Sequence, residues 1–338
     1  MNFNEILNQK EYSFLKENKH LGKNICLLTL GGSLAYGTNL PDKGDVDIRG
    51  ITLEHPKDLI GFGTFEQVVE NNTDTVIYSF NKMVKLLLQC NPNTIEILGC
   101  KPEHYFVLTD AGKMLIDNQK LFLSKRAGFT FGAYAAQQLN RMMNALARDR
   151  FSQSEKEEQI LRSLTAAMCS FNTRYKHLDC GNMKLFTDKT DRENFETEIF
   201  ADINFNRFPV REFNGIMNEL SSIVRAYNKC SHRNHKKDDE HLNKHAMHLI
   251  RLYLMGIDLL EKEQIITYRE KDRHLLLGIR RGKFMKSDGT YSEDFFDLMN
   301  SLKERFEYAT KNTSLPEKPD LNKVEDIVFE VNKKIILN

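Results

Sequence analysis

The segment NICLLTLGGSLAYGTNLPDKGDVDIRGITL, residues 24–53, decides how this chain is predicted to fold. Its first part, residues 24–30, is a short apolar run that ends at a pair of glycines, as a buried strand followed by a tight turn does. Its last part, residues 45–53, alternates between polar and apolar side chains, which is typical of a half-buried strand. Two strands joined through a Gly-rich turn are therefore expected here.

Two aspartates of the second predicted strand have the spacing of a metal site. Asp45 and Asp47 are two residues apart, so their side chains project from one face of the strand, about 6 to 7 Å apart. Two carboxylates on one face repel each other unless a cation lies between them. Mg²⁺ (or Mn²⁺) prefers such oxygen ligands and shares them with substrate phosphates. The pair therefore predicts a site for a divalent metal ion.

The glycine turn supplies the other half of this predicted site. Glycine lets the backbone approach a phosphate closely, and the amides at the start of a following helix point at the anion. Ser33, after Gly31 and Gly32, adds a hydroxyl donor, and Arg49 lies on the face of the two aspartates. A glycine turn alone, or an Asp-x-Asp pair alone, is common in unrelated proteins. Their occurrence together, each beside a strand, favours a nucleotide-binding site.

The two motifs resemble the signature of the DNA polymerase β nucleotidyltransferase superfamily. More narrowly, the chain resembles the YcgL-type predicted nucleotidyltransferases of bacteria and phages, which are linked to RNA repair. The segments that carry the narrower resemblance are 32–38, 45–50, 91–96, 244–252 and 276–283, so it spans roughly residues 24–285. Gly44 stands where that family usually has serine, which removes a side-chain donor but leaves the carboxylate pair intact.

The resemblance implies a mixed-sheet catalytic domain that uses magnesium and a nucleoside triphosphate (NTP). Asp45 and Asp47 would be metal ligands, and Gly32 and Ser33 would hold phosphates. Asp74, just before the next predicted strand, is the best placed candidate for a third acidic ligand. The alternative is that Asp74 is simply an exposed residue at the start of a strand.

The pattern of the chain changes beyond about residue 120, where helical spacing replaces strand-like alternation. Helices are predicted over residues 1–20, 80–89, 124–150, 154–178, 210–230 and 239–263, and loops over 181–209 and 231–240. An α+β fold is therefore predicted, with a small mixed-sheet nucleotidyltransferase domain at residues 1–120. A mostly helical nucleotide- or substrate-binding domain is predicted at residues 121–338.

Basic side chains of this helical part are candidates for binding phosphate. Lys244, His248 and Arg251 have the spacing of one helix face and would contact the triphosphate or a nucleic-acid backbone. The alternative is a solvated helix face with ordinary charges. Arg280 and Lys283, near Gly278 and Gly282, are further candidates for contact with phosphate or RNA.

Composition excludes some classes of protein. The 338 residues include 48 basic and 47 acidic side chains, so there is no global charge signal for nucleic acid. No apolar run approaches the roughly 18 to 20 residues of a membrane span, and the polar N-terminus lacks the features of a secretory signal. Six scattered cysteines without a CxxC pair indicate free thiols in a reducing compartment. A cytoplasmic protein without membrane contact is therefore expected.

The predicted reaction is attack of a hydroxyl on the α-phosphorus of an NTP, with release of pyrophosphate. The link to RNA repair favours an RNA 3′ end, tRNA-like or broken, as the acceptor. A protein side chain or another nucleotide remains open as the acceptor. The alternative from another class is a non-catalytic nucleotide- or RNA-binding module, and the intact Asp-x-Asp pair argues against it.

Overall fold

The computed structural model describes residues 3–40, 46–150, 181–189, 197–215, 217–218, 221 and 239–337. Two compact units make up the chain. The larger contains residues 1–136, 247–283 and 293–338, and the smaller contains residues 137–246 and 284–292. The predicted domain boundary at residue 120 stays a prediction.

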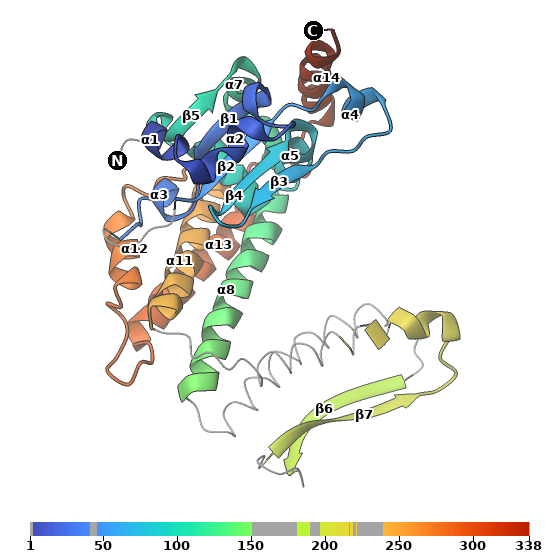
Figure 1. The fold of residues 1–338 in the computed structure, drawn as a ribbon. Helices are drawn as coiled ribbons and strands as arrows, with labels where there is room; N and C mark the ends of the chain where they lie inside the picture. Colours follow the sequence, from blue (N-terminus) through green and yellow to red (C-terminus); the bar gives the residue numbers. More distant parts are fainter. Residues whose placement is uncertain are drawn as a thin grey trace. The chain divides into compact units, whose positions relative to one another are not determined.

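A five-stranded mixed sheet forms the centre of the larger unit (Figure 1), in the order β3-β4-β2-β1-β5. The strands are β1 (Ile25–Leu30), β2 (Ile48–Thr52), β3 (Gln67–Glu70), β4 (Thr75–Ser79) and β5 (Tyr105–Leu108). β2 and β4 are parallel, and the other neighbours are antiparallel. The mixed sheet, followed by a mostly helical C-terminal region, confirms the predicted α+β class.

One face of the sheet is covered by the N-terminal segment. Leu28, Ile48 and Ile77 pack there in one cluster with Tyr12 and Leu15. The segment consists of α1 (Phe3–Leu7), a 3-10 turn η1 (Lys10–Tyr12) and α2 (Phe14–Glu17). The prediction of a single helix over residues 1–20 was therefore wrong. The backbone is extended at Gln9, with ψ 154°, which interrupts the helix.

The opposite face of the sheet carries the predicted site. Thr29, Arg49 and Val76 are register partners across β1, β2 and β4. Because side chains alternate along a strand, Asp47 lies on the same face as Arg49. The chain then enters α5 (Phe80–Leu87), capped by Ser79, whose Oγ accepts from the Lys82 N–H at 3.3 Å. The predicted helix over residues 80–89 is thus confirmed.

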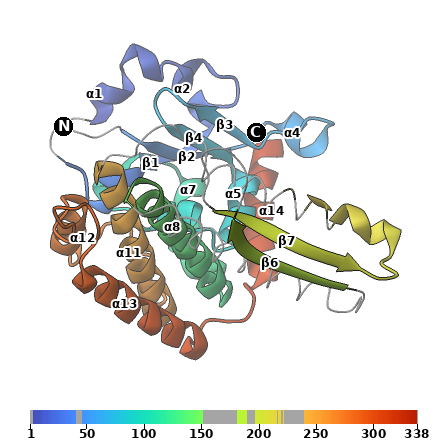
Figure 2. The same cartoon turned by 90° about the horizontal axis from the view of Figure 1, so that it is seen from below.

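Helices complete the larger unit, and Figure 2 shows α8, α11 and α13 side by side. An added Cβ at Gly256 of α11 would lie 2.5 Å from the Phe306 ring of α13, so glycine permits this close approach. The predictions for residues 124–150 and 239–263 are confirmed by α8 (Arg126–Arg150) and α11 (Asp239–Lys262). The predicted helix over 154–178, and most of the one over 210–230, lie outside the described residues. The remaining elements are η2 (Gly22–Asn24), α3 (Gly32–Tyr36), α4 (Pro56–Ile60), α6 (Pro92–Ile95), η3 (Glu96–Gly99), η4 (Pro102–His104), α7 (Asp110–Asp117), η5 (Gln119–Phe122), α12 (Arg273–Arg280), α13 (Glu293–Asn312) and α14 (Leu321–Leu337).

The smaller unit contains an antiparallel ribbon of β6 (Gly181–Lys189) and β7 (Thr197–Phe205). The prediction of a loop over residues 181–209 was therefore wrong. The polar residues of both strands conceal the alternation, whereas pairing depends on partners across the ribbon. Phe186 and Phe200 are such partners, with ring centroids 6.2 Å apart.

The composition predicts no membrane span and free cysteine thiols. Among the helices that the structure describes, none is both long and apolar enough to cross a bilayer. Of the described cysteines, Cys26, Cys90 and Cys100 are free thiols. Burial raises the pKa of Cys26 and Cys100 to about 12, so both stay protonated at neutral pH. The predicted cytoplasmic location stays a prediction.

Candidate functional site

The glycine turn packs directly against Asp47. The Gly31 N–H donates to the Asp47 carbonyl at 2.8 Å, which ties the turn after β1 to the residue before β2. Gly32 has a left-handed backbone with φ 53°. A Cβ at Gly32 would lie 1.5 Å from Asp47 Oδ2 and 2.6 Å from its Cγ. Only glycine fits here, because the Asp47 carboxylate occupies the place of a side chain.

We expect Gly32→Ala to lower the free energy of unfolding by about 1–3 kcal/mol, because the new methyl group clashes with Asp47 and the left-handed backbone disfavours alanine. Gly132→Ala in α8 is the matched control. Its added Cβ would meet only the Phe306 ring, with Cε1 at 3.4 Å and Cζ at 4.0 Å. In a helix interior that change is neutral or stabilising by roughly 0.5–1 kcal/mol. Denaturant unfolding of both variants measures the difference, and equal stabilities would contradict the close packing at Gly32.

Asp74 and Asp47 directly precede two parallel neighbouring strands. Asp47 precedes Ile48 of β2 and Asp74 precedes Thr75 of β4, and Ile48 and Thr75 are register partners. Arg49 Nη2 pairs with Asp74 Oδ1 at 3.1 Å, and Arg49 Nη1 donates to the Asp74 carbonyl. The Asp74 side chain is 58% exposed and that of Arg49 is 20% exposed. The structure therefore brings Gly32, Asp47, Arg49 and Asp74 to one end of the sheet.

The residues for a metal ion are only partly within the described chain. Asp45 lies outside the described residues, and within them no group of three or more His, Cys, Asp or Glu side chains is placed to hold a metal. The carboxylate oxygens of Asp47 and Asp74 are the donors that Mg²⁺ and Mn²⁺ prefer. The donor type and the position of Asp47 against the glycine turn fit such an ion. The metal and its ligands stay a prediction.

The predicted basic stripe lies on α11. Lys244 is exposed and belongs to the smaller unit, whereas His248 and Arg251 belong to the larger one. The His248 ring lies edge-on to Tyr36, with centroids 6.1 Å apart. Arg251 Cζ is 3.7 Å from the centroid of the Tyr36 ring. His248 and Arg251 thus reach the end of α3, and contact of the stripe with phosphate stays a prediction.

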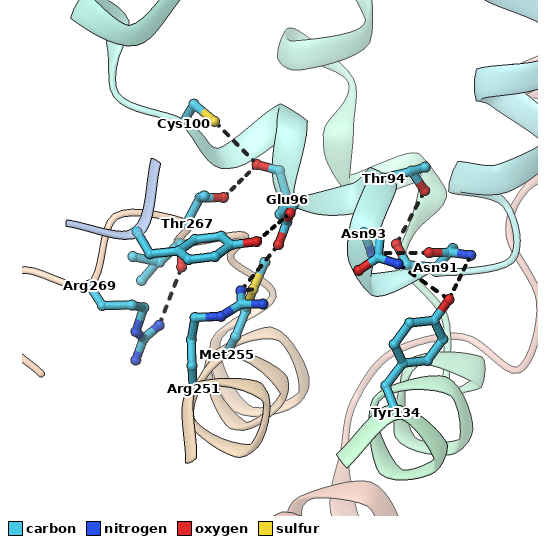
Figure 3. A network of polar contacts seen from close by, with 12 residues as sticks. Asn91, Asn93, Thr94, Glu96, Cys100, Tyr134, Arg251, Met255, Thr267 and Arg269 are labelled. Atoms are coloured by element: carbon cyan, nitrogen blue, oxygen red, sulfur yellow. Dashed lines mark hydrogen bonds and ion pairs between the residues drawn. The ribbon is translucent and has the colours of Figure 1, made fainter. Parts of the chain in front are cut away.

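Glu96 is a buried carboxylate to which sequence reasoning assigned no role. Figure 3 shows Arg251 extending from α11 toward it, and Arg251 Nη1 lies 3.1 Å from Glu96 Oε2. The Tyr36 hydroxyl donates to Glu96 Oε1 at 2.8 Å. Burial raises the pKa of Tyr36 far above its usual range, so the hydroxyl stays a donor. An acid inside the apolar run 95–98 was the signal for such a buried pair.

A second polar cluster contains Asn91 and Asn93, from the segment 91–96 that carries part of the family resemblance. The side-chain amides of Asn91 and Asn93 each lie 3.5 Å from the Tyr134 hydroxyl (Figure 3). Asn91 also caps α6, since its Oδ1 accepts from the Asn93 N–H at 3.0 Å. This segment therefore joins the start of α6 to α8.

A cleft of about 650 Å³ opens between the N-terminal segment and the turn before β4. Among the described residues that line it are the carboxylates of Glu11, Glu70 and Asp74, and none of those described residues is a lysine or an arginine. The described part of this cleft is therefore acidic, and Asp74 lies both on its lining and beside Arg49. The lining consists of Ile6, Gln9, Glu11, Tyr12, Val46 and residues 69–74.

Comparison with known proteins gives one match. Residues 3–168 match the family described as RNA repair pathway DNA polymerase beta family. The matched range includes the glycine turn, the Asp-x-Asp pair and Asp74. No curated protein and no solved structure matches the chain.

Proposed function

Residues 3–168 of this chain belong to the RNA repair pathway DNA polymerase beta family, and from this premise we propose a metal-dependent nucleotidyltransferase. Its reaction transfers a nucleoside monophosphate from an NTP to a hydroxyl group and releases pyrophosphate. The proposed acceptor is the 3′ end of an RNA, either a broken end or a tRNA-like one. The proposed compartment is the cytoplasm.

The contact between Gly32 and Asp47 is the observation that carries this proposal. It joins a backbone that suits phosphate to a carboxylate that suits a metal ion, and these are the two parts that NTP chemistry needs side by side. A plain surface loop has no need of a left-handed glycine pressed against a carboxylate. The position of Asp74 at the same end of the sheet as Asp47 supports the same function.

Each residue has a role in the proposed reaction. The backbone amides after Gly31 and the Ser33 hydroxyl bind and orient the triphosphate. Asp45, Asp47 and Asp74 would hold Mg²⁺ or Mn²⁺, which when bound neutralises phosphate charge and increases the acidity of the acceptor hydroxyl. The Asp74 carboxylate is exposed and would help to accept the proton of an incoming hydroxyl.

Other predicted contacts extend the phosphate site. Arg49 pairs with Asp74 and lies on the face of Asp47, so it would stabilise charge that develops on the α-phosphate. Of the predicted stripe, His248 is proposed to contact the outer phosphates or the RNA backbone, whereas Arg251 is buried in its ion pair with Glu96.

Transfer of labelled nucleotide tests the proposal. Each of the four NTPs, labelled at the α-phosphate, is incubated with the full chain, Mg²⁺ and a pool of small RNAs, and parallel reactions contain EDTA. We expect label in RNA with at least one NTP, none with EDTA, and none when the label is at the γ-phosphate. Label in protein or in a small soluble product would show that the reaction is nucleotidyl transfer but that the acceptor is not RNA. Nucleotide binding without any transfer would favour a binding module and overturn the proposal.

A further inference from the structure

Three consecutive backbone carbonyls at the end of α3 are each bound by the segment 269–280. The Tyr36 carbonyl accepts from the Arg269 N–H at 3.1 Å, and the Gly37 carbonyl accepts from Arg273 Nε at 2.9 Å. The Thr38 carbonyl accepts from Arg280 Nη1 at 2.6 Å. A helix normally ends with carbonyls that lack partners within the helix. Here a distant part of the chain supplies those partners.

The same segment also fixes the turn by packing. Gly37 has a left-handed backbone with φ 75°, and a Cβ there would lie 2.6 Å from the Tyr268 ring. The other face of the segment is anchored in turn. Arg269 Nη1 donates to Asp258 at 2.6 Å, and Arg269 Nε donates to Asp272 at 2.8 Å. The partners of α3 are therefore held by α11 and by the start of α12.

The burial of Arg280 distinguishes it from its neighbour. Its side chain is 7% exposed, whereas Arg281 is exposed. The sequence predicted that Arg280 contacts phosphate or RNA directly, but its Nη1 points inward to a carbonyl of the chain itself. Burying a guanidinium costs free energy unless its N–H groups are hydrogen-bonded, and the Thr38 carbonyl is one such partner of Arg280.

We infer that residues 268–280 form a clamp that keeps residues 33–38 in the shape that binds phosphate, with Arg273 and Arg280 as positioning residues. The Thr38 N–H donates to the Ser33 carbonyl at 2.9 Å, so displacement of Thr38 is transmitted to Ser33. The clamp acts on the triphosphate without touching it. This inference rests on the proposed function in so far as the turn binds an NTP.

The test compares Arg280→Ala, Arg280→Lys and Arg281→Ala in the full chain. Calorimetric titration with each of the four NTPs and Mg²⁺ measures binding, and hydrogen exchange measures protection of the peptide that covers residues 31–38. We expect Arg280→Ala to weaken NTP binding about tenfold, because a charge-assisted hydrogen bond is lost. Protection of residues 31–38 should fall while that of β2 is unchanged. Arg280→Lys should recover part of both effects, and Arg281→Ala should match the wild type.

Arg273→Ala guards against a failure of Arg280→Ala to fold. Arg273 is exposed apart from its bond to Gly37, so its loss should leave the fold intact and give a smaller effect of the same kind. Unchanged exchange at residues 31–38 in Arg273→Ala and in folded Arg280→Ala would overturn the clamp. If the wild type binds no NTP, the proposed function fails, and exchange at residues 31–38 still decides whether the clamp exists.

Discussion

Asp47→Asn should reduce nucleotidyl transfer by about 10³-fold, since removal of one preorganised electrostatic group from an active site costs 10²–10³-fold. Asparagine has nearly the same shape, so it keeps the packing against Gly32 while it removes the charge that would hold the metal ion. The midpoint of thermal unfolding should stay close to that of the wild type. Initial rates with α-labelled NTP and Mg²⁺ measure the effect.

Asp117→Asn is the matched control for this variant. Asp117 is exposed and is the last residue of α7, where a negative charge gains nothing from the helix dipole. Its replacement should leave the transfer rate unchanged and should not lower the unfolding midpoint. Without a divalent ion, NTP should bind Asp47→Asn at least as well as the wild type, because repulsion of phosphate is removed. A folded Asp47→Asn protein with wild-type activity would exclude Asp47 as a metal ligand.

The local part of the site could be predicted because its signals are local. An apolar run followed by two glycines fixed β1 and the start of α3, and the alternation around Asp47 predicted β2. The distance between Gly32 and Asp47 did not follow from these patterns. It depends on the antiparallel pairing of β1 with β2, which brings together two residues fifteen positions apart in the chain.

The ion pairs and hydrogen bonds that hold the residues around the site could not be predicted, because they join residues far apart in the chain. Glu96 meets Arg251 across 155 positions, and Thr38 meets Arg280 across 242. No periodicity links such positions. The sequence does contain one signal. A charged side chain within an apolar run that becomes buried needs a partner of opposite charge or a hydrogen-bond partner. Read in that way, Glu96 predicts a buried cation but does not say which one.

Arg251→Met should lower the free energy of unfolding by about 3–5 kcal/mol, because removal of one member of a buried ion pair leaves the other charge without compensation. The Arg251 and Glu96 side chains are 5% and 9% exposed, so water does not replace the lost partner. Arg251 also lies over the Tyr36 ring, and this contact is lost as well. Denaturant unfolding measures the effect.

Arg305→Met is the control, because Arg305 makes the same kind of pair with Glu261 on the surface. Its side chain is 54% exposed, and such pairs contribute only about 0–1 kcal/mol. The double variant Glu96→Gln/Arg251→Met completes a cycle. We expect it to be less destabilised than the sum of the single variants by about 1–3 kcal/mol, because the two residues are in contact. If the losses of unfolding free energy in the two single variants add up to that of the double variant, Glu96 and Arg251 stabilise the region independently. An energetic coupling from α11 through Glu96 to Tyr36 and α3 would then be excluded.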